Sequence, residues 1–109
     1  MIHMITVTIH RDSKGYKGFQ VVGHAGYAQE GYDIICSAVS ALVVNAVNSI
    51  EAFTEDRFAA REEEGTVELI LEGAVSDRTA LLLDSMILGL RDIQTQYGNE
   101  FIRLKIEEV

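Results

Sequence analysis

The amino-acid sequence predicts a single domain of the α/β (α+β) class, residues 1–109, in which a four-stranded sheet packs against two helices. Two observations support this prediction. Four segments alternate apolar and polar residues as half-buried strands do, and two long segments repeat apolar residues at the spacing of one helical face. In chain order the elements read ββαβαβ. A chain of 109 residues has the length of one domain with one core.

The first two predicted strands form a hairpin. Residues 4–10 alternate, with Ile5, Val7 and Ile9 on one side of the strand. Residues 12–18 contain turn-forming residues, including two glycines. The second strand follows over residues 19–24, so that His24 lies at its C-terminal end.

The first predicted helix runs from Asp33 to about Phe53. Asp33 is a good N-cap, because its carboxylate can accept a hydrogen bond from the amides of the first turn. The core-facing residues predicted by the spacing are Val39, Leu42, Val43, Ala46, Val47, Ile50 and Phe53.

The second predicted helix begins after Ser76 as N-cap and ends at about Tyr97, with Gly98 as the C′ residue. Its core stripe is Leu83, Met86, Ile87, Leu90, Ile93 and Tyr97. Three further leucines, Leu81, Leu82 and Leu88, fall outside this stripe. They widen the apolar surface and favour a homodimer contact.

The remaining segments complete the predicted sheet. Residues 55–64 are strongly charged and are expected to form a loop or a frayed helix. Residues 66–72 alternate as a third strand, and residues 101–107 as a fourth. In the fourth strand Ile102, Leu104 and Ile106 are expected to face the core.

Charge and hydropathy narrow the classes of partner. Nine basic against 17 acidic residues give a net charge of −8, which repels phosphate backbones and predicts no direct nucleic-acid partner. Basic proteins or peptides are favoured instead. Residues 1–7 lack the pattern of a signal peptide, and the uncharged stretch 34–50 is shorter than the roughly 20 residues of a membrane span. The expected location is cytoplasmic, with no membrane contact.

The chemistry-bearing residues are Cys36 and His24. Cys36 is the only cysteine, so it cannot form a disulfide within the chain. With Asp33 as cap, Cys36 is the third helical residue, where unbonded amides and the helix dipole favour a thiolate. The same amides could stabilise an oxyanion. A nearby His24 can take the thiol proton, as a cysteine nucleophile requires.

Each of these residues also has a purely structural interpretation. A lone cysteine is more often a small buried hydrophobe, and a lone histidine is more often a surface or hydrogen-bonded residue. Asp33 can be only a helix cap, and Ser40 only a hydroxyl bonded to a backbone carbonyl. A metal site is disfavoured, because His3, His10, His24 and Cys36 include no close ligand pair.

The segment over residues 23–42 carries a family resemblance. Gly-His-Ala-Gly, a spacer, and then Gly-x-Asp-Ile-Ile-Cys-Ser-Ala-Val-Ser-Ala-Leu resembles the ribosomal-processing cysteine proteases called Prp. The family pattern usually reads Asp-Ile-Val-Cys-Ala-Ala-Val-Ser, so Ile35 and Ser37 replace a valine and an alanine. Both replacements are small changes that do not touch the proposed chemistry.

The resemblance implies a cysteine endopeptidase with no cofactor. It would remove a short, apolar and aromatic N-terminal extension from a basic large-subunit ribosomal protein, the one numbered twenty-seven. The family's nucleophile matches Cys36, its general base matches His24, and its motif aspartate and serine match Asp33 and Ser40 in supporting roles. No residue is evident as a third catalytic partner. The family is also dimeric.

The loop between the proposed base and nucleophile is expected to order over a bound peptide. Gly26 and Gly31 bracket it, with Gly23 at its start, and Tyr27 or Tyr32 could pack against apolar substrate side chains. A rigid turn that needs these glycines only for its geometry is the alternative.

A second class of function also fits the sequence. A non-catalytic, acidic ribosome-assembly or protein-binding module could hold the same basic protein in the same groove. Charge does not separate the two, but a binding module has no need of a thiol next to an imidazole.

Overall fold

The predicted hairpin lies at the centre of the sheet. In the computed structural model β1 (Ile5–Asp12) pairs antiparallel with β2 (Gly15–Val22). The structure describes residues 4–23, 32–63, 65–98 and 100–109, with the backbone alone at positions 32 and 33. The hairpin turn contains only two residues, Ser13 and Lys14, so both strands reach further into the predicted turn than the alternation indicated.

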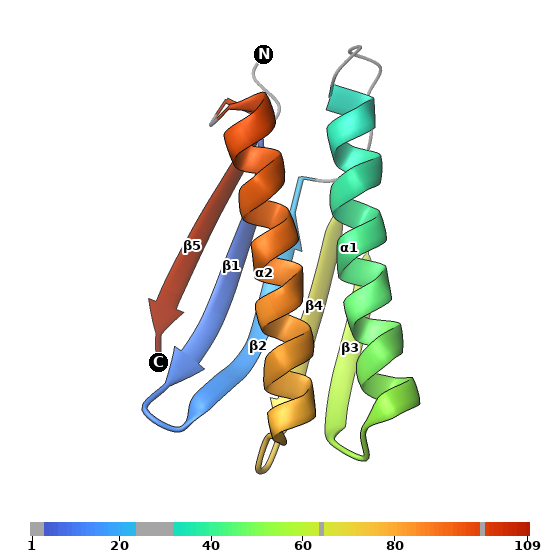
Figure 1. Cartoon of the computed structure of the whole chain (residues 1–109), viewed down its shortest axis with the longest axis vertical. Helices are drawn as coiled ribbons and strands as arrows, with labels where there is room; N and C mark the ends of the chain where they lie inside the picture. The colour runs from blue at the N-terminus through green and yellow to red at the C-terminus, as the bar shows by residue number, and fades with distance from the viewer. Residues whose placement is uncertain (1–3, 24–31, 64, 99) are drawn as a thin grey trace.

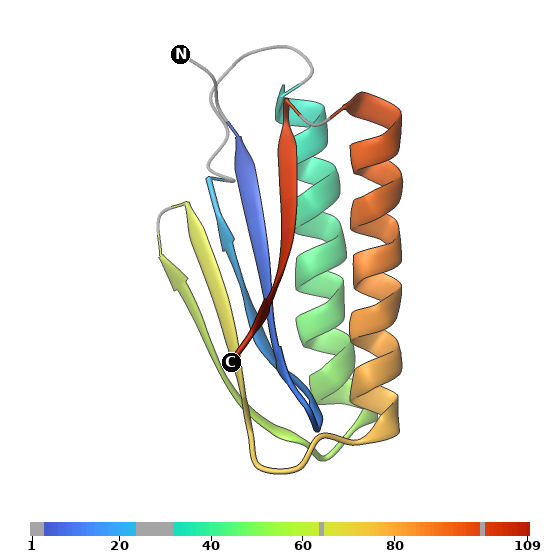
Figure 2. The ribbon, with the colours of Figure 1, turned by 90° about the vertical axis from the view of Figure 1, so that its left-hand side faces the viewer.

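Among the described residues, five strands, not the predicted four, form the sheet. The chain continues through α1 (Tyr32–Phe53), β3 (Arg57–Glu63), β4 (Thr66–Glu72), α2 (Asp77–Tyr97) and β5 (Ile102–Glu108). The sheet order is β3-β4-β2-β1-β5, and only the β1–β5 pair is parallel. Both helices lie side by side on one face of the sheet (Figures 1 and 2). The α+β class is therefore confirmed, with one additional strand.

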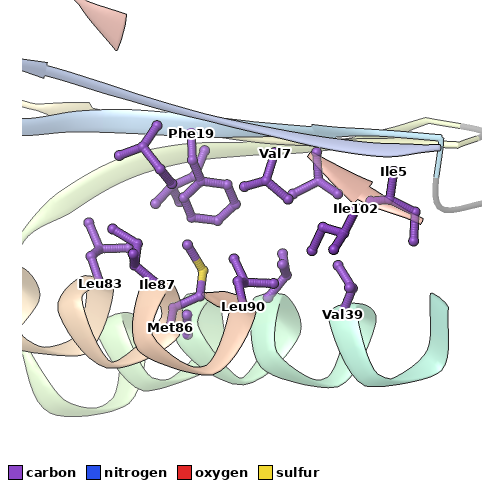
Figure 3. Packing of buried hydrophobic residues seen from close by; sticks show 14 of the residues in the cluster. Ile5, Val7, Phe19, Val39, Leu83, Met86, Ile87, Leu90 and Ile102 are labelled. Atoms are coloured by element: carbon purple, nitrogen blue, oxygen red, sulfur yellow. The ribbon is translucent and has the colours of Figure 1, made fainter. Parts of the chain in front are cut away.

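The core fills the space between this face and the two helices. Phe19 from β2 is fully buried between Val7 of β1 and Met86 and Leu90 of α2 in Figure 3. From α1, the buried residues are Ile35, Cys36, Val39, Val43, Ala46 and Ile50. The helical spacing thus identified the core face of α1 correctly, except that Phe53 at its end is 63% exposed.

The ends of α2 are those expected from the sequence. Ser76 is the N-cap, its hydroxyl accepting a hydrogen bond from the Thr79 amide at 3.3 Å. Gly98 ends the helix with φ +95°, and its amide donates to the Gln94 carbonyl at 2.8 Å. Asp56 accepts hydrogen bonds from the amide and hydroxyl of Ser76, at 2.9 and 2.7 Å. The hydroxyl of Thr79 and both groups of Ser76 lower the pKa of Asp56.

The α2 face also contacts the hairpin. The Tyr16 hydroxyl donates to the carboxylate of Asp84, and the Arg11 guanidinium lies over the Tyr16 ring, 5.5 Å from its centroid. Burial, together with this carboxylate, raises the pKa of Tyr16 to about 12. These contacts fix the β1–β2 hairpin against α2.

The segment 55–64 was predicted wrongly as loop or frayed helix. It contains β3, which lies at the sheet edge and pairs with β4 alone. Apart from Phe58, which is half-buried, all the side chains of β3 are exposed. No apolar alternation marks this strand, because its side chains are exposed on both faces and only its backbone groups pair with β4.

Three further apolar residues, Ile106, Tyr97 and Leu82, lie elsewhere than predicted. Ile106 is 44% exposed, because β5 is the other edge of the sheet, and Tyr97 is 40% exposed at the end of α2. Leu82 packs against the core, whereas Leu81 and Leu88 are 68% and 63% exposed. The apolar surface on α2 therefore consists of two leucines, not three.

Residues Ile34–Phe53 of α1 have the length and composition of a membrane span: 20 residues with a mean hydropathy of 1.6. The length argument against a span is therefore wrong. The buried face of α1 packs on the sheet, as in the core helix of a globular domain.

Candidate active site

Cys36 lies near the N-terminal end of α1, with only 6% of its surface exposed. Both sequence expectations for this residue, burial and a helix-start position, thus hold together. Ile35 before it is fully buried, whereas Ile34 is 61% exposed, so the chain enters the core at this point.

The helix begins two residues earlier than predicted, since the predicted cap at Asp33 made Ile34 its first residue. Tyr32 is its first residue, so Asp33 is the second helical residue and not the N-cap. Cys36 is consequently the fifth residue, and its amide already donates to the carbonyl of Tyr32 within the helix. The amides without a partner in the helix belong to residues 32–34, one turn before Cys36. An oxyanion site built by α1 would use these amides and not that of Cys36.

Ser40 lies one helical turn after Cys36 and lines a cleft of about 90 Å³. The same cleft is lined by Val43 and Val44 of α1 and by Val21 and Val67 of the sheet. Ser40 is half-buried there, and most of the remaining lining is aliphatic. The structure thus places the predicted supporting serine at an apolar cleft, four residues along α1 from Cys36.

A second cleft continues the first. It has a volume of about 250 Å³ and shares Val44, Val67 and Glu62 with its neighbour. Together the two form the α1–β3 groove, which runs along α1 opposite β3. Figure 2 shows β3 and β4 curving away from the helix layer toward the end of β3.

Glu62 is the acidic residue of this groove. The register pairs it with Val67, which in turn pairs with the buried Val21, so its position faces the helices. Sequence reasoning missed Glu62 because it predicted a loop or a frayed helix over residues 55–64. The only available signal was the charge run itself, which does not show which carboxylate points toward α1.

Gly23 lies directly after β2 and requires glycine. Its φ is +92°, and a Cβ there would lie 2.5 Å from the carbonyl oxygen of Met4. Its amide donates to the carbonyl of Gly65, in the β3–β4 turn, at 2.8 Å. β2 ends at Val22, whereas the sequence predicted that this strand would end at His24.

The other predicted site residues lie wholly or partly outside the described residues. His24, Gly26, Tyr27 and Gly31 fall in residues 24–31, and the side chains of Tyr32 and Asp33 are likewise not described. The proposed Cys36–His24 pair and the loop that orders over a peptide stay predictions. Within the described ranges, no group of three His, Cys, Asp or Glu residues is placed to hold a metal ion.

Comparison with known proteins identifies the family. The family model described as cysteine protease Prp matches residues 4–102. The ribosomal processing cysteine protease Prp of Bacillus subtilis (strain 168) is 32% identical over 101 residues, which is 86% of this chain and 90% of that protein.

Solved structures agree with this match. The essential ribosomal processing protease Prp from S. aureus, in complex with a substrate peptide, superposes with a TM-score of 0.87 at 30% identity, over 95% of this chain and all of that one. The same protease with a covalently linked product peptide gives a TM-score of 0.84 at 31% identity, with the same coverage. This chain, whose single cysteine lies near the start of α1, belongs to the Prp family of cysteine proteases.

Proposed function

We propose that this protein is an endopeptidase that removes the short N-terminal extension of the large-subunit ribosomal protein numbered twenty-seven. The observation that carries the proposal is the position of Cys36, near the start of α1 and one turn from the apolar cleft at Ser40. The names of the relatives, which describe ribosomal processing, support the same class of substrate. A net charge of −8 favours a basic protein as substrate.

In the proposed reaction Cys36 is the nucleophile and His24 the general base. His24 takes the thiol proton as Sγ attacks the scissile carbonyl carbon, and then gives that proton to the leaving amine. Water hydrolyses the resulting thioester and restores the thiol. The amides of residues 32–34 are the donors that α1 offers to the oxyanion.

Asp33 and Ser40 are assigned supporting roles. Ser40 lines the cleft, so its hydroxyl is placed to hold a peptide that lies there. Asp33, the second residue of α1, is assigned its role because it matches the family's motif aspartate. We leave the third member of the catalytic set unassigned.

The substrate assignment is tested by intact mass. After incubation with this protein, the ribosomal protein should lose the mass of its extension and nothing more. If it is bound but keeps its mass, the acidic binding module is the better description. We place this reaction in the cytoplasm, where ribosomal proteins are assembled.

The thiol of Cys36 is expected to have a pKa below its ordinary value. Burial disfavours the thiolate, but the start of α1 and a neighbouring imidazole both favour it. Alkylation by iodoacetamide, followed against pH by mass, should therefore show a midpoint below that of a model thiol. In His24→Ala the midpoint should rise. An ordinary midpoint in the unmodified protein would exclude an activated thiol, and no change in His24→Ala would exclude the ion pair.

We further propose that the protein is a homodimer through α2. Leu81 and Leu88 lie seven positions apart, on one face of the helix, and both are strongly exposed. Sedimentation velocity over a range of concentrations should show a dimer, and Leu81→Glu with Leu88→Glu should shift it to monomer. A monomer throughout the micromolar range in the unmodified protein would contradict this assembly.

A further inference from the structure

The α1–β3 groove lies on the same stripe of α1 as Cys36. Ser40 lies four positions after Cys36, and Val44 lies eight positions after it. The three residues therefore line up along one helix face. Val44 and Ser40 both line the groove. A peptide held at Cys36 can therefore continue directly into it.

The dimensions of the groove suit an extended chain. Val44 lies eight positions after Cys36, which corresponds to a distance of about 12 Å along the helix axis. An extended peptide covers this distance in about four residues, at roughly 3.3 Å per residue. Substrate residues about two to four positions from the scissile bond would thus lie between Ser40 and Val44.

The lining defines which side chains these residues should have. Val43, Val44 and Val67 present aliphatic surface, and Val44 is 47% exposed when nothing covers it. Apolar side chains would remove this surface from water, at about 25 cal/mol per Å². The edge of β3 that does not face β4 offers backbone groups to an extended chain beside the groove.

Glu62 adds a charge requirement. It is exposed and lines both parts of the groove. Among the described residues no ion pair joins Glu62 to a cation, whereas the neighbouring Arg61 pairs with Glu63 at 4.0 Å and with Glu68 at 3.1 Å. A cationic substrate side chain at this point would meet a carboxylate that forms no ion pair within the described part of the chain.

We propose that the α1–β3 groove is the specificity subsite for an extended, apolar segment of the substrate, and that Glu62 selects a basic residue next to that segment. This inference rests on the proposed protease function. It names the groove, Val44 and Glu62 as determinants of which peptides are cleaved.

The first test removes the apolar surface. Val44→Asp should raise KM for a peptide spanning the junction of the ribosomal protein's extension by about tenfold or more, because a charge would be desolvated against apolar side chains. The value of kcat should change far less. Asn45→Asp is the matched control, since it adds the same charge one position along α1, on a surface that does not line the groove. It should leave KM unchanged.

The second test reverses the charge. Peptides with Lys or Glu substituted singly at each of the four residues on either side of the scissile bond are compared by kcat/KM. The unmodified protein should prefer Lys at one position near the apolar segment, and Glu62→Lys should invert that preference. Glu63→Lys is the control, because Glu63 alternates to the other face of β3.

Binding separates this inference from the proposed function. The same peptides, labelled with a fluorophore, are titrated onto the Cys36→Ala protein and followed by anisotropy. If the peptide binds with the expected dependence on Val44 and Glu62 but is not cleaved by the unmodified protein, the groove is supported as a binding site and the protease assignment is wrong. If cleavage and binding are both insensitive to the two substitutions, the groove is not the subsite.

Discussion

Replacement of Cys36 by alanine is expected to reduce cleavage of the ribosomal protein by about 10⁴-fold or more, to the background rate, because no other thiol in the chain can attack the peptide. The fold should survive. Removing one buried sulfur atom costs about 1 kcal/mol, and alanine is the best helix former. The prediction therefore separates chemistry from folding.

Intact mass of the ribosomal protein over time measures the cleavage, and thermal unfolding of the variant measures its stability. Ser37→Ala is the matched control, since Ser37 is the exposed neighbour of Cys36 on α1. It should cleave at the rate of the unmodified protein. Full-rate processing by a folded Cys36→Ala protein would falsify the cysteine mechanism.

Gly18→Ala is expected to have the largest effect on stability, a loss of about 3 kcal/mol or more. Gly18 lies in β2 opposite His10 on one side and Ile70 on the other. Its φ is +151°, and a Cβ there would lie 2.1 Å from the backbone carbonyl oxygen of Leu69. The alanine would have to push β4 away from β2 in the middle of the sheet.

Urea unfolding followed by circular dichroism measures this loss, and Gly15→Ala is its control. Gly15 also has a positive φ, of +127°, but a Cβ there would meet no atom within 4 Å. It should therefore cost only the conformational strain, about 1 kcal/mol. Equal losses in the two variants would show that the approach of β4 is not the cause.

Sequence reasoning succeeded where the determining interactions are local. The caps of α2, Ser76 and Gly98, were predicted correctly, because a cap depends on residues within one turn. The buried face of α1 followed from periodicity alone. The same local pattern placed Cys36 near a helix start, so a reactive thiol could be proposed before the fold was known.

Local reasoning failed where the determining contact comes from a distant part of the chain. The sequence predicted Gly18 as a turn residue. It is instead a strand residue that must be glycine, because the backbone of β4 leaves no room for a Cβ there. The sequence placed Leu82 outside the core stripe of α2, yet Leu82 packs against the hydrophobic core.

The sequence by itself determined the α+β class, the core faces of both helices, and the placement of the single cysteine near the start of a helix. Only the tertiary structure decided that residues 57–63 form an edge strand and that Glu62 faces α1 across an apolar groove. The physical reason is that the side chains of β3 are exposed on both faces of the sheet, so they carry no periodic signal, and the strand is held by backbone hydrogen bonds to β4. A groove between that strand and a helix exists only once both have packed on the same sheet.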